Sequence, residues 1–417
     1  MERTASWPTR WAFYGWMFSL PFDVITPTWL PQQLQGQLSL PRMIAAAFML
    51  CFLLDQRLRP WRLPPASLAF ASFFVIFAVL MLRYGLGDLT TVIAQFQSLL
   101  IFFACYNLFL TRWAVRGGLL AYAFACGLAA LLLATGMANA EVSALTDGRL
   151  TGLAGSNENA YSQVLGVGVL LAIGVAHIRK EKTVAHLFLL WAIILLAALF
   201  IVRAGSRGQT LALAVGVAIF ILRKGSIWTH LANVALMTII GIAGAYLFLS
   251  SDVLKERWAE AVETGTTSGR TKIYRESIGL ILEKPLIGWS ASGGEHLASR
   301  LHVVKTQRRG VHNHLLTMLL FTGLAGSIPY FWGYLTILRN AWWARRGIEN
   351  VLPLALFVTL FIGDFISGGL PEKLHWSFFA YMLAAGTTAL AVRPVRRAAK
   401  TAPRASPFCQ TRPHPKH

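Results

Sequence analysis

The chain has 417 residues, of which 55% are hydrophobic and only 13% are charged, whereas soluble domains carry about 25% charged residues. This composition excludes an ordinary soluble domain, and apolar runs of about 18 residues or more recur along the whole length. The net charge of +20 could indicate nucleic acid, but basic residues beside membrane spans explain it equally well, and we expect no nucleic-acid partner. Because the runs lack the polar–apolar alternation of a barrel, we expect an all-α integral membrane protein.

About twelve apolar segments are predicted to cross the membrane as helices. They cover roughly residues 11–30, 38–55, 66–83, 89–110, 117–136, 159–178, 185–203, 209–222, 228–250, 314–338, 350–368 and 375–392. We expect residues 1–392 to form a single transmembrane domain, with a mostly helical segment, 251–313, inserted between the ninth and tenth spans. Residues 393–417 contain several prolines and no acidic residue, so they are expected to form a basic, disordered cytoplasmic tail.

The short loops after even-numbered spans carry most of the flanking positive charge. They contain Arg57, Arg112, Arg179, Arg223 and Arg339. By the positive-inside rule these loops and both termini are expected to be cytoplasmic. The loops after odd-numbered spans, among them 137–158, 204–208 and 251–313, then face the other side of the membrane.

The segment 251–313 gathers ionisable residues and has a helical pattern of its own. Residues 252–262 and 271–283 each suit an amphipathic helix. We expect Ser268 to cap the second helix, Arg270 to lie at its entrance and Pro285 to end it. Its buried face is predicted to consist of Ile273, Ser277, Leu280 and Ile281.

Glycines mark two further features near this segment. Residues 288–294, which contain Gly288, Gly293 and Gly294, are expected to form a flexible loop over a pocket. Gly323 and Gly326 in the tenth span are predicted to allow close helix packing and nothing more.

Arginines on the non-cytoplasmic side are not explained by the positive-inside rule. Arg203 and Arg207 lie at the outer end of the seventh span, and Arg270 lies in the polar segment. Guanidinium groups hold phosphate oxygens bidentately, so a lipid-linked phosphate or diphosphate is a suitable ligand for Arg207 and Arg270. Arg149, Arg203 and Arg275 are further candidates for the same ligand. The alternative is that these side chains reach lipid headgroups or pair with nearby acids.

His312 stands in the sequence Gly310-Val-His-Asn-His314, and a histidine near neutral pKa can accept a proton from a hydroxyl. It could also be structural, or bind a metal together with His302 and His314. No carboxylate pair or zinc-like spacing accompanies these histidines, so we expect neither a metal nor another cofactor.

Asn157 and Glu158 precede the sixth span. Either they cap that helix, or they contact a sugar or phosphate, with Glu158 as a reserve base.

Several short motifs follow one another in an order that resembles the bacterial O-antigen ligases. The wider group includes the O-antigen polymerases and the protein O-oligosaccharyltransferases. The motifs are Gly155-Ser-Asn-Glu-Asn159, Ser206-Arg-Gly208, Ser268-Gly-Arg270, Lys284-Pro-Leu-Ile-Gly288, His312-Asn313 and Phe321-Thr-Gly-Leu-Ala-Gly326. The resemblance covers about residues 155–326, and the rest of the chain agrees only in hydropathy.

The resemblance implies a GT-C-like, inverting and metal-independent glycosyltransferase in the bacterial inner membrane, with its active site facing the periplasm. It would move a glycan from undecaprenyl diphosphate to a sugar hydroxyl of the lipid A–core oligosaccharide. The family's essential arginines match Arg207 and Arg270, and its essential histidine matches His312. We expect the neighbouring Asn313 and His314 to contact substrate, although His314, in the first turn of the tenth span, could instead meet only headgroups.

Polymerase activity and transfer to protein stay open within the family. The alternative from another class is a transporter or flippase for lipid-linked glycans. The absence of an internal repeat and the small number of acids within the spans count against it. Charges gathered at one outer face favour an enzyme, whereas charges distributed through the midplane favour transport.

Overall fold

The structure is a computed structural model in which the chain is mainly helical. It describes the chain except residues 1–3, 24–38, 84–88, 138–152, 154–156, 179–183, 205, 222–226, 229, 232–233, 236–237, 240, 243–245, 247–269, 291–292, 302–310, 369–371 and 392–417. Within the described helices, some side chains are also outside the description, among them those of Glu158, Arg203 and Arg207.

Apolar sequences with suitable end residues determine where the helices begin and end. Proline stands in the first turn of α1, α2 and α14, where its missing N–H leaves no hydrogen bond unmade. The last of these helices ends at Gly368, whose positive φ of 63° suits a residue without a Cβ. The main helices are α1 (Trp7–Ser19), α2 (Leu40–Leu54), α3 (Ser67–Arg83), α4 (Leu89–Phe109), α5 (Arg112–Ala134), α6 (Glu158–Ile178), α7 (Val184–Arg203), α8 (Arg207–Ile221), α11 (Arg270–Glu283), α12 (Gly293–Arg300), α13 (His314–Ala344), α14 (Leu352–Ser367) and α15 (Lys373–Ala391).

Eleven of the predicted spans overlap helices of the structure, namely α1 to α8 and α13 to α15. By length and composition, four helices in the described part of the chain can cross a membrane: Thr91–Phe109, Arg112–Ala134, Asn159–Ala176 and His314–Ala344. Several others are apolar but shorter. The chain is thus an all-helical, multi-pass membrane protein over its described residues. The ninth span falls mostly outside those residues, and the count of twelve and the GT-C-like class stay predictions.

The helix ends gather at two opposite ends of the bundle. At one end, Trp16 Nε1 donates to Ser377 Oγ at 3.2 Å, and Lys373 forms an ion pair with Asp23 at 2.5 Å. These contacts join the end of α1 to the start of α15. At the other end, the Ser6 N–H donates to Asp55 Oδ2 at 2.7 Å, which joins the start of α1 to the end of α2. We call the first end, which also holds Ser206, His312 and Gly368, the site end.

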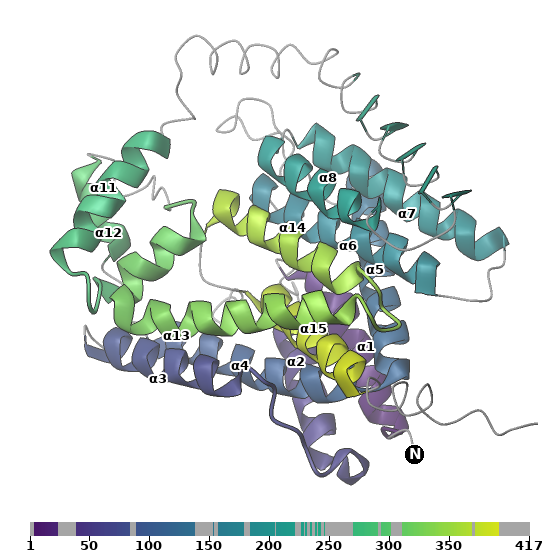
Figure 1. Cartoon of the computed structure of the whole chain (residues 1–417), viewed down its shortest axis with the longest axis horizontal. Helices are drawn as coiled ribbons and strands as arrows, with labels where there is room; N and C mark the ends of the chain where they lie inside the picture. Colours follow the sequence, from purple (N-terminus) through teal and green to yellow (C-terminus); the bar gives the residue numbers. More distant parts are fainter. Residues whose placement is uncertain are drawn as a thin grey trace, which may run out of the picture.

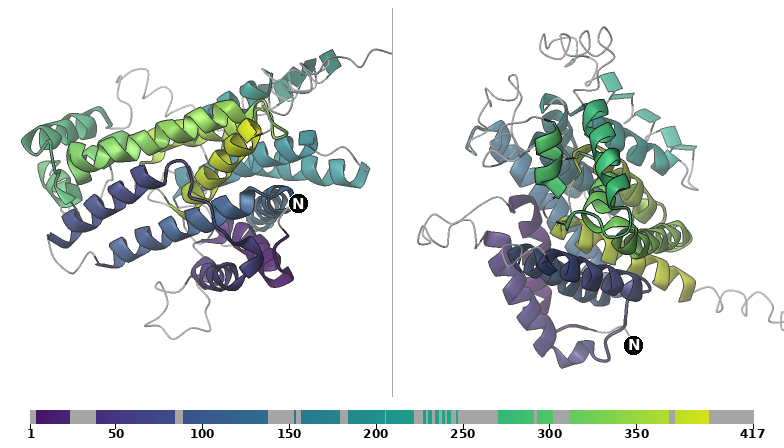
Figure 2. Two further views of the ribbon diagram at one scale, coloured as in Figure 1. Left: turned by 60° about the horizontal axis from the view of Figure 1, so that its bottom comes forward. Right: turned by 90° about the vertical axis from the view of Figure 1, so that its left-hand side faces the viewer.

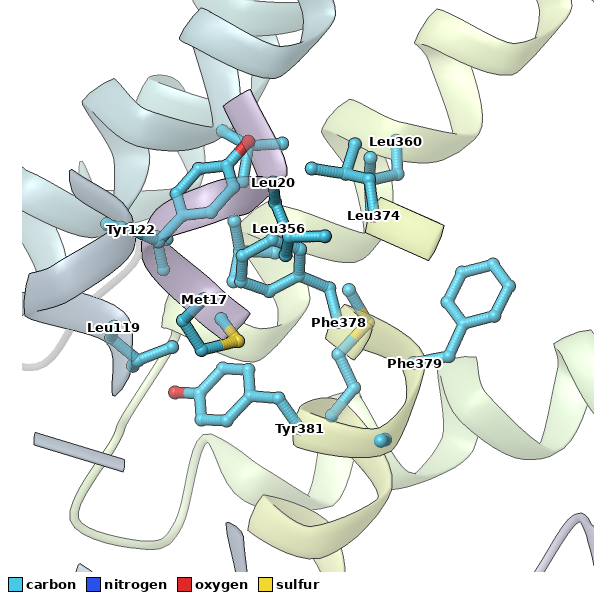
Figure 3. Close-up of a cluster of buried hydrophobic side chains, with 14 of the residues drawn as sticks. Met17, Leu20, Leu119, Tyr122, Leu356, Leu360, Leu374, Phe378, Phe379 and Tyr381 are labelled. Carbon is cyan, nitrogen blue, oxygen red and sulfur yellow. The ribbon is translucent and has the colours of Figure 1, made fainter. Parts of the chain in front are cut away.

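Helix α15 lies at the centre of the bundle. Every residue from Leu374 to Gly386 is buried, as expected for a helix that is apolar on all sides and surrounded by others. Figure 3 shows the cluster that it forms with residues of α1, α5 and α14. The labelled members are Met17, Leu20, Leu119, Tyr122, Leu356, Leu360, Leu374, Phe378, Phe379 and Tyr381. Helices α3, α4 and the long part of α13 run side by side along one flank (Figures 1 and 2).

Helix α13 is not the straight span that the sequence predicted. Gly323 has φ 56° and ψ −161°, which breaks the helix into two limbs, 314–322 and 324–344. In a straight helix, His314 and Tyr330 would stand about 24 Å apart along the axis. Instead, His314 Nε2 and the Tyr330 hydroxyl are 2.8 Å apart, so the first limb folds back over the second. The second limb, about 30 Å long, is enough to cross a bilayer by itself.

The break in α13 is filled by the segment that follows α11. The Trp289 N–H donates to the Leu320 carbonyl at 2.7 Å, and the N–H groups of Leu324 and Ala325 donate to the Pro285 and Leu286 carbonyls at 2.8 and 2.9 Å. These bonds satisfy backbone groups that the break releases from the helix. Two of the sequence motifs, around Lys284–Gly288 and Phe321–Gly326, are therefore the two halves of one joint.

This joint corrects two expectations. Gly323 is the break itself rather than a simple packing glycine, because a methyl group there would lie 2.4 Å from the Leu286 carbonyl carbon. The stretch 288–294 is not a loose loop in its described part. Gly288 packs against the Gly323 N–H, and the buried Ser290 hydroxyl donates to the Leu80 carbonyl at 3.0 Å. Gly293 and Gly294 already belong to α12.

Candidate functional site

Helix α11 holds Arg270 at its first residue, as the sequence predicted. Ile273, Ser277 and Leu280 are buried and Ile281 is half-buried, so the predicted face is the one that packs against the first limb of α13. Pro285 follows the last residue of the helix by two positions. The proposed cap Ser268 lies outside the described residues.

The two arginines of α11 lie on different sides of the helix. Arg270 is one helical turn before Tyr274, whose hydroxyl donates to the His312 carbonyl at 3.2 Å. Residues four apart share a helix face, so Arg270 is on the side that contacts the His312 segment. Arg275 is about 140° further round the helix and is exposed, whereas Arg270 is half-exposed. The structure thus brings Arg270, and not Arg275, toward His312.

His312 is held in an unusual backbone conformation at the site end. Its φ is 50°, in the left-handed region that non-glycine residues rarely adopt. Its backbone packs directly on Gly368 at the end of α14, where an added Cβ would lie 2.5 Å from the His312 Cα. The side chain is half-buried. Contacts with α11 on one side and α14 on the other therefore fix this histidine in a conformation of a kind that clusters at functional sites.

Asn313 and His314 have structural roles in this arrangement. The Asn313 side chain accepts from the Leu316 N–H at 3.1 Å and caps α13. His314 is 5% exposed, and its ring contacts Tyr330 and Tyr334. It lies in the first turn of α13 as predicted, but it faces the protein interior, so the expectation that it meets headgroups is wrong.

The start of α8 belongs to the same end of the bundle. Helix α8 begins at Arg207, and Ser206 just before it donates to Asn159 Oδ1 at 2.7 Å. Gly208 packs so closely on Ile366 of α14 that an added Cβ would lie 2.5 Å from that side chain. Ile366 is two residues before Gly368, against which His312 packs. Asn159, the motif at 206–208 and the motif at 312–313 thus meet around the end of α14.

The remaining predicted site residues lie at helix ends or outside the part of the chain that the structure describes. Asn157 is exposed, and its Oδ1 accepts from the Asn159 N–H at 2.9 Å. It therefore caps α6, which was one of the two roles that the sequence left open. Arg203 is the last residue of α7, and Glu158 is the first of α6. Arg149 and His302 lie outside the described residues. Among the described residues, no group of three histidine, cysteine or acidic side chains could hold a metal ion.

Sequence reasoning missed a buried polar network beside this site. Asp364 of α14 is 7% exposed, and its Oδ1 lies 2.7 Å from His375 Nε2 of α15. The amide of Gln163 on α6 donates to the same oxygen at 3.0 Å, and the Tyr334 hydroxyl donates to Oδ2 at 3.0 Å. The signal was present, because Asp364 is the one charged residue in the apolar sequence of α14. A charged side chain inside a span is energetically costly, so it is usually paired and often marks a functional site.

A comparison with protein-family models finds one match. The model described as O-antigen ligase matches residues 191–331, which include Arg207, Arg270, His312 and both halves of the joint at Gly323. This match confirms the resemblance of that third of the chain to the O-antigen ligase family. A search of curated proteins finds no match.

Proposed function

We propose that this protein is an O-antigen ligase. It transfers a glycan from undecaprenyl diphosphate to a sugar hydroxyl of the lipid A–core oligosaccharide, at the periplasmic face of the inner membrane. The observation that carries the proposal is the placement of His312. It is held between α11, which begins with Arg270, and the end of α14, which also packs against Gly208, the residue after Arg207 in the first turn of α8. A histidine that can act as a base, together with two helices that begin with arginine, at one end of a membrane bundle, suits transfer from a lipid-linked diphosphate.

The arginines act on the leaving group in this mechanism. A diphosphate is already activated, so the transition state mainly requires stabilisation of the negative charge that develops as the anomeric C–O bond breaks. Arg207 and Arg270 supply that charge without a metal ion, and the N–H groups at the start of α8 favour an anion as well. The acceptor hydroxyl attacks opposite the diphosphate, which inverts the anomeric centre.

His312 accepts the proton of the attacking hydroxyl. A half-buried imidazole can reach an acceptor sugar, and histidine is the side chain whose unperturbed pKa lies closest to neutral pH. His314 is unsuited to that task, because it is buried and its Nε2 is hydrogen-bonded to Tyr330. Of the two histidines, we therefore assign the base to His312.

The orientation in the membrane follows from the charge distribution. Both termini are cytoplasmic, and the site end faces the periplasm. This assignment agrees with the described helix ends, because Ser206 and His312, which belong to two segments predicted to lie outside, are at the same end of the bundle. The tails of the donor and acceptor lipids would run alongside the helices, so both substrates diffuse to the site in the plane of the membrane.

The choice of acceptor distinguishes an O-antigen ligase from a polymerase or a protein oligosaccharyltransferase. Purified protein would be given undecaprenyl-diphosphate-linked glycan with lipid A–core, with a second glycan or with a pilin-like protein, in separate reactions. The proposal expects product with lipid A–core only. Product with glycan or protein alone would make the chain a polymerase or an oligosaccharyltransferase. Movement of the donor across a vesicle membrane without any product would make it a flippase.

A further inference from the structure

The pair formed by His375 and Asp364 is the centre of a network that joins α14 to three other helices just beneath the site end. Both residues are buried: the exposed fraction is 8% for His375 and 7% for Asp364. The carboxylate accepts hydrogen bonds from α15, α6 and α13 through His375, Gln163 and Tyr334. Asp364 lies in the last turn of α14, where the helix dipole disfavours a negative charge. A carboxylate in this position is stable only while its donors remain in place.

The contacts of His375 determine its tautomer. The Glu372 N–H donates to His375 Nδ1 at 3.3 Å, so Nδ1 is an acceptor and the ring proton is on Nε2. Nε2 then donates to Asp364 Oδ1 at 2.7 Å. Such an arrangement, in which one ring nitrogen is fixed by a backbone group and the other binds a carboxylate, orients both partners. Asp364 accepts three hydrogen bonds and is therefore the carboxylate of the pair.

Asp364 is also linked to the segment that holds His312 through the backbone at the end of α14. The Gly368 N–H donates to the Asp364 carbonyl at 3.2 Å, and Gly368 packs on the His312 backbone. The ionisable groups that interact with Asp364 are His375 and Glu372 at the start of α15 and His314, Tyr330 and Tyr334 of α13. Lys373 and Asp23 form an ion pair with each other and interact with Glu372. An anion one helical turn from Gly368 favours a positive charge on a histidine packed there.

We propose that His375 is a positioning residue. It holds Asp364 as an oriented carboxylate, and this carboxylate stabilises the imidazolium that forms when His312 takes the acceptor proton. The proposal rests on the proposed function, because it assigns to His312 the proton that ligation releases. No bond is made or broken at His375 or Asp364 themselves. The proton moves from the acceptor hydroxyl to His312, and the electron pair of the broken C–O bond leaves with the diphosphate.

The test compares two substitutions at His375. His375→Phe removes the donor to Asp364, and the buried carboxylate then takes up a proton. His375→Gln keeps an N–H group that can donate to it. Single-turnover transfer at saturating donor and acceptor would be measured against pH, together with the affinity for undecaprenyl diphosphate. Ser377→Ala, a buried polar position two residues further along α15 that bonds Trp16 instead, is the matched control.

For His375→Phe we expect at least a tenfold loss of the transfer rate, a shift of the acidic limb of the pH profile to lower pH, and a donor affinity within about threefold of the original. His375→Gln should restore most of the rate and the position of the acidic limb. Ser377→Ala should leave both unchanged. An unmoved acidic limb in His375→Phe, or equal loss in the phenylalanine and glutamine variants, overturns the proposal, because a purely structural residue would behave in that way.

If His375→Phe does not fold, Asp364→Asn decides the question. It preserves the shape of the side chain and removes only the charge, so the same shift of the acidic limb is expected, and its absence overturns the proposal. Failure of this inference is distinguishable from failure of the proposed function. In the first case His312→Gln is inactive while the His375 variants retain an ordinary pH profile. In the second case His312→Gln remains active.

Discussion

Replacement of Gly323 by alanine should damage both stability and transfer, because this residue forms the joint between α13 and the segment after α11. Its φ and ψ of 56° and −161° lie in a region that is essentially restricted to glycine and costs other residues about 1–3 kcal/mol. An added Cβ would also lie 2.4 Å from the Leu286 carbonyl carbon and 2.6 Å from the Ile287 nitrogen. Forcing atoms into such a packed place costs about 1–3 kcal/mol more.

The chain could avoid the clash by releasing the segment 285–289 from the break. That would lose the three backbone hydrogen bonds made by Trp289, Leu324 and Ala325, each of which contributes about 1 kcal/mol. The first route costs about 2–6 kcal/mol and the second about 3 kcal/mol, and either is a large part of the roughly 5–15 kcal/mol that stabilises an ordinary domain. Since α11 is anchored through this segment, Arg270 would lose its place on the face of α11 that contacts the His312 segment.

The assay is thermal unfolding of the purified variant in detergent, together with transfer of glycan from the lipid-linked donor. Gly294→Ala serves as the control, because Gly294 lies in α12 with open space where a Cβ would stand, and alanine favours a helix. Gly323→Ala should unfold at a clearly lower temperature and transfer at least tenfold more slowly than Gly294→Ala. Equal stability and activity in the two variants would refute the structural role given to the joint.

Three further predictions test the site and its orientation. Single cysteines at Ser292 and Ala402 in a cysteine-free background should label from the periplasmic and cytoplasmic sides respectively, and labelling from one side only would contradict the topology. Transfer should persist in excess EDTA, since arginines balance the diphosphate charge; loss with chelator and recovery with Mg²⁺ or Mn²⁺ would contradict this. Arg207→Ala and Arg270→Ala should each abolish transfer and weaken donor binding, with partial rescue by lysine. Arg275→Ala should behave nearly as the original protein, and normal transfer by either of the first two variants would remove that arginine from the site.

Periodicity and end signals made much of the fold predictable. The second helix of the polar segment was expected over 271–283 and is observed from Arg270 to Glu283, because its apolar residues recur at helical spacing and Pro285 stops it. Most spans overlap helices for the same reason, since a long apolar sequence has few alternatives in lipid. The predicted buried face of α11 was correct as well.

The bend in α13 could not be read from periodicity. Gly323 lies in a continuous apolar sequence, where a glycine usually indicates close packing, and its positive φ depends on the carbonyls of Pro285 and Leu286, about forty residues earlier in the sequence. The burial of His314 follows from the same bend, since only a folded-back limb places it against Tyr330. The local sequence around Gly323 therefore could not predict a bend that depends on residues distant in the chain.

The network around Asp364 was missed for a different reason. An aspartate inside an apolar span was a visible signal, but its partners come from three other helices, α6, α13 and α15, and nothing in the sequence pairs them. The sidedness of the spans and the motif order predicted that the segments with Arg207, Arg270 and His312 belong to one end of the bundle, and their role as a common site stays a prediction. The contacts through Gly208, Tyr274 and Gly368 that join their segments required the structure.

The central claim is that His312 accepts the proton of the acceptor hydroxyl, and one comparison tests it most directly. Single-turnover transfer would be measured against pH for His312→Gln and His314→Gln with saturating donor and acceptor, along with the affinity of each variant for the donor. A general base contributes about 10²–10⁴ in rate, so His312→Gln should lose at least a hundredfold in transfer while it keeps its donor affinity. His314→Gln can still hydrogen-bond Tyr330 and should lose much less. Full activity in His312→Gln would contradict the account. An inactive His314→Gln together with an active His312→Gln would move the role of base to His314.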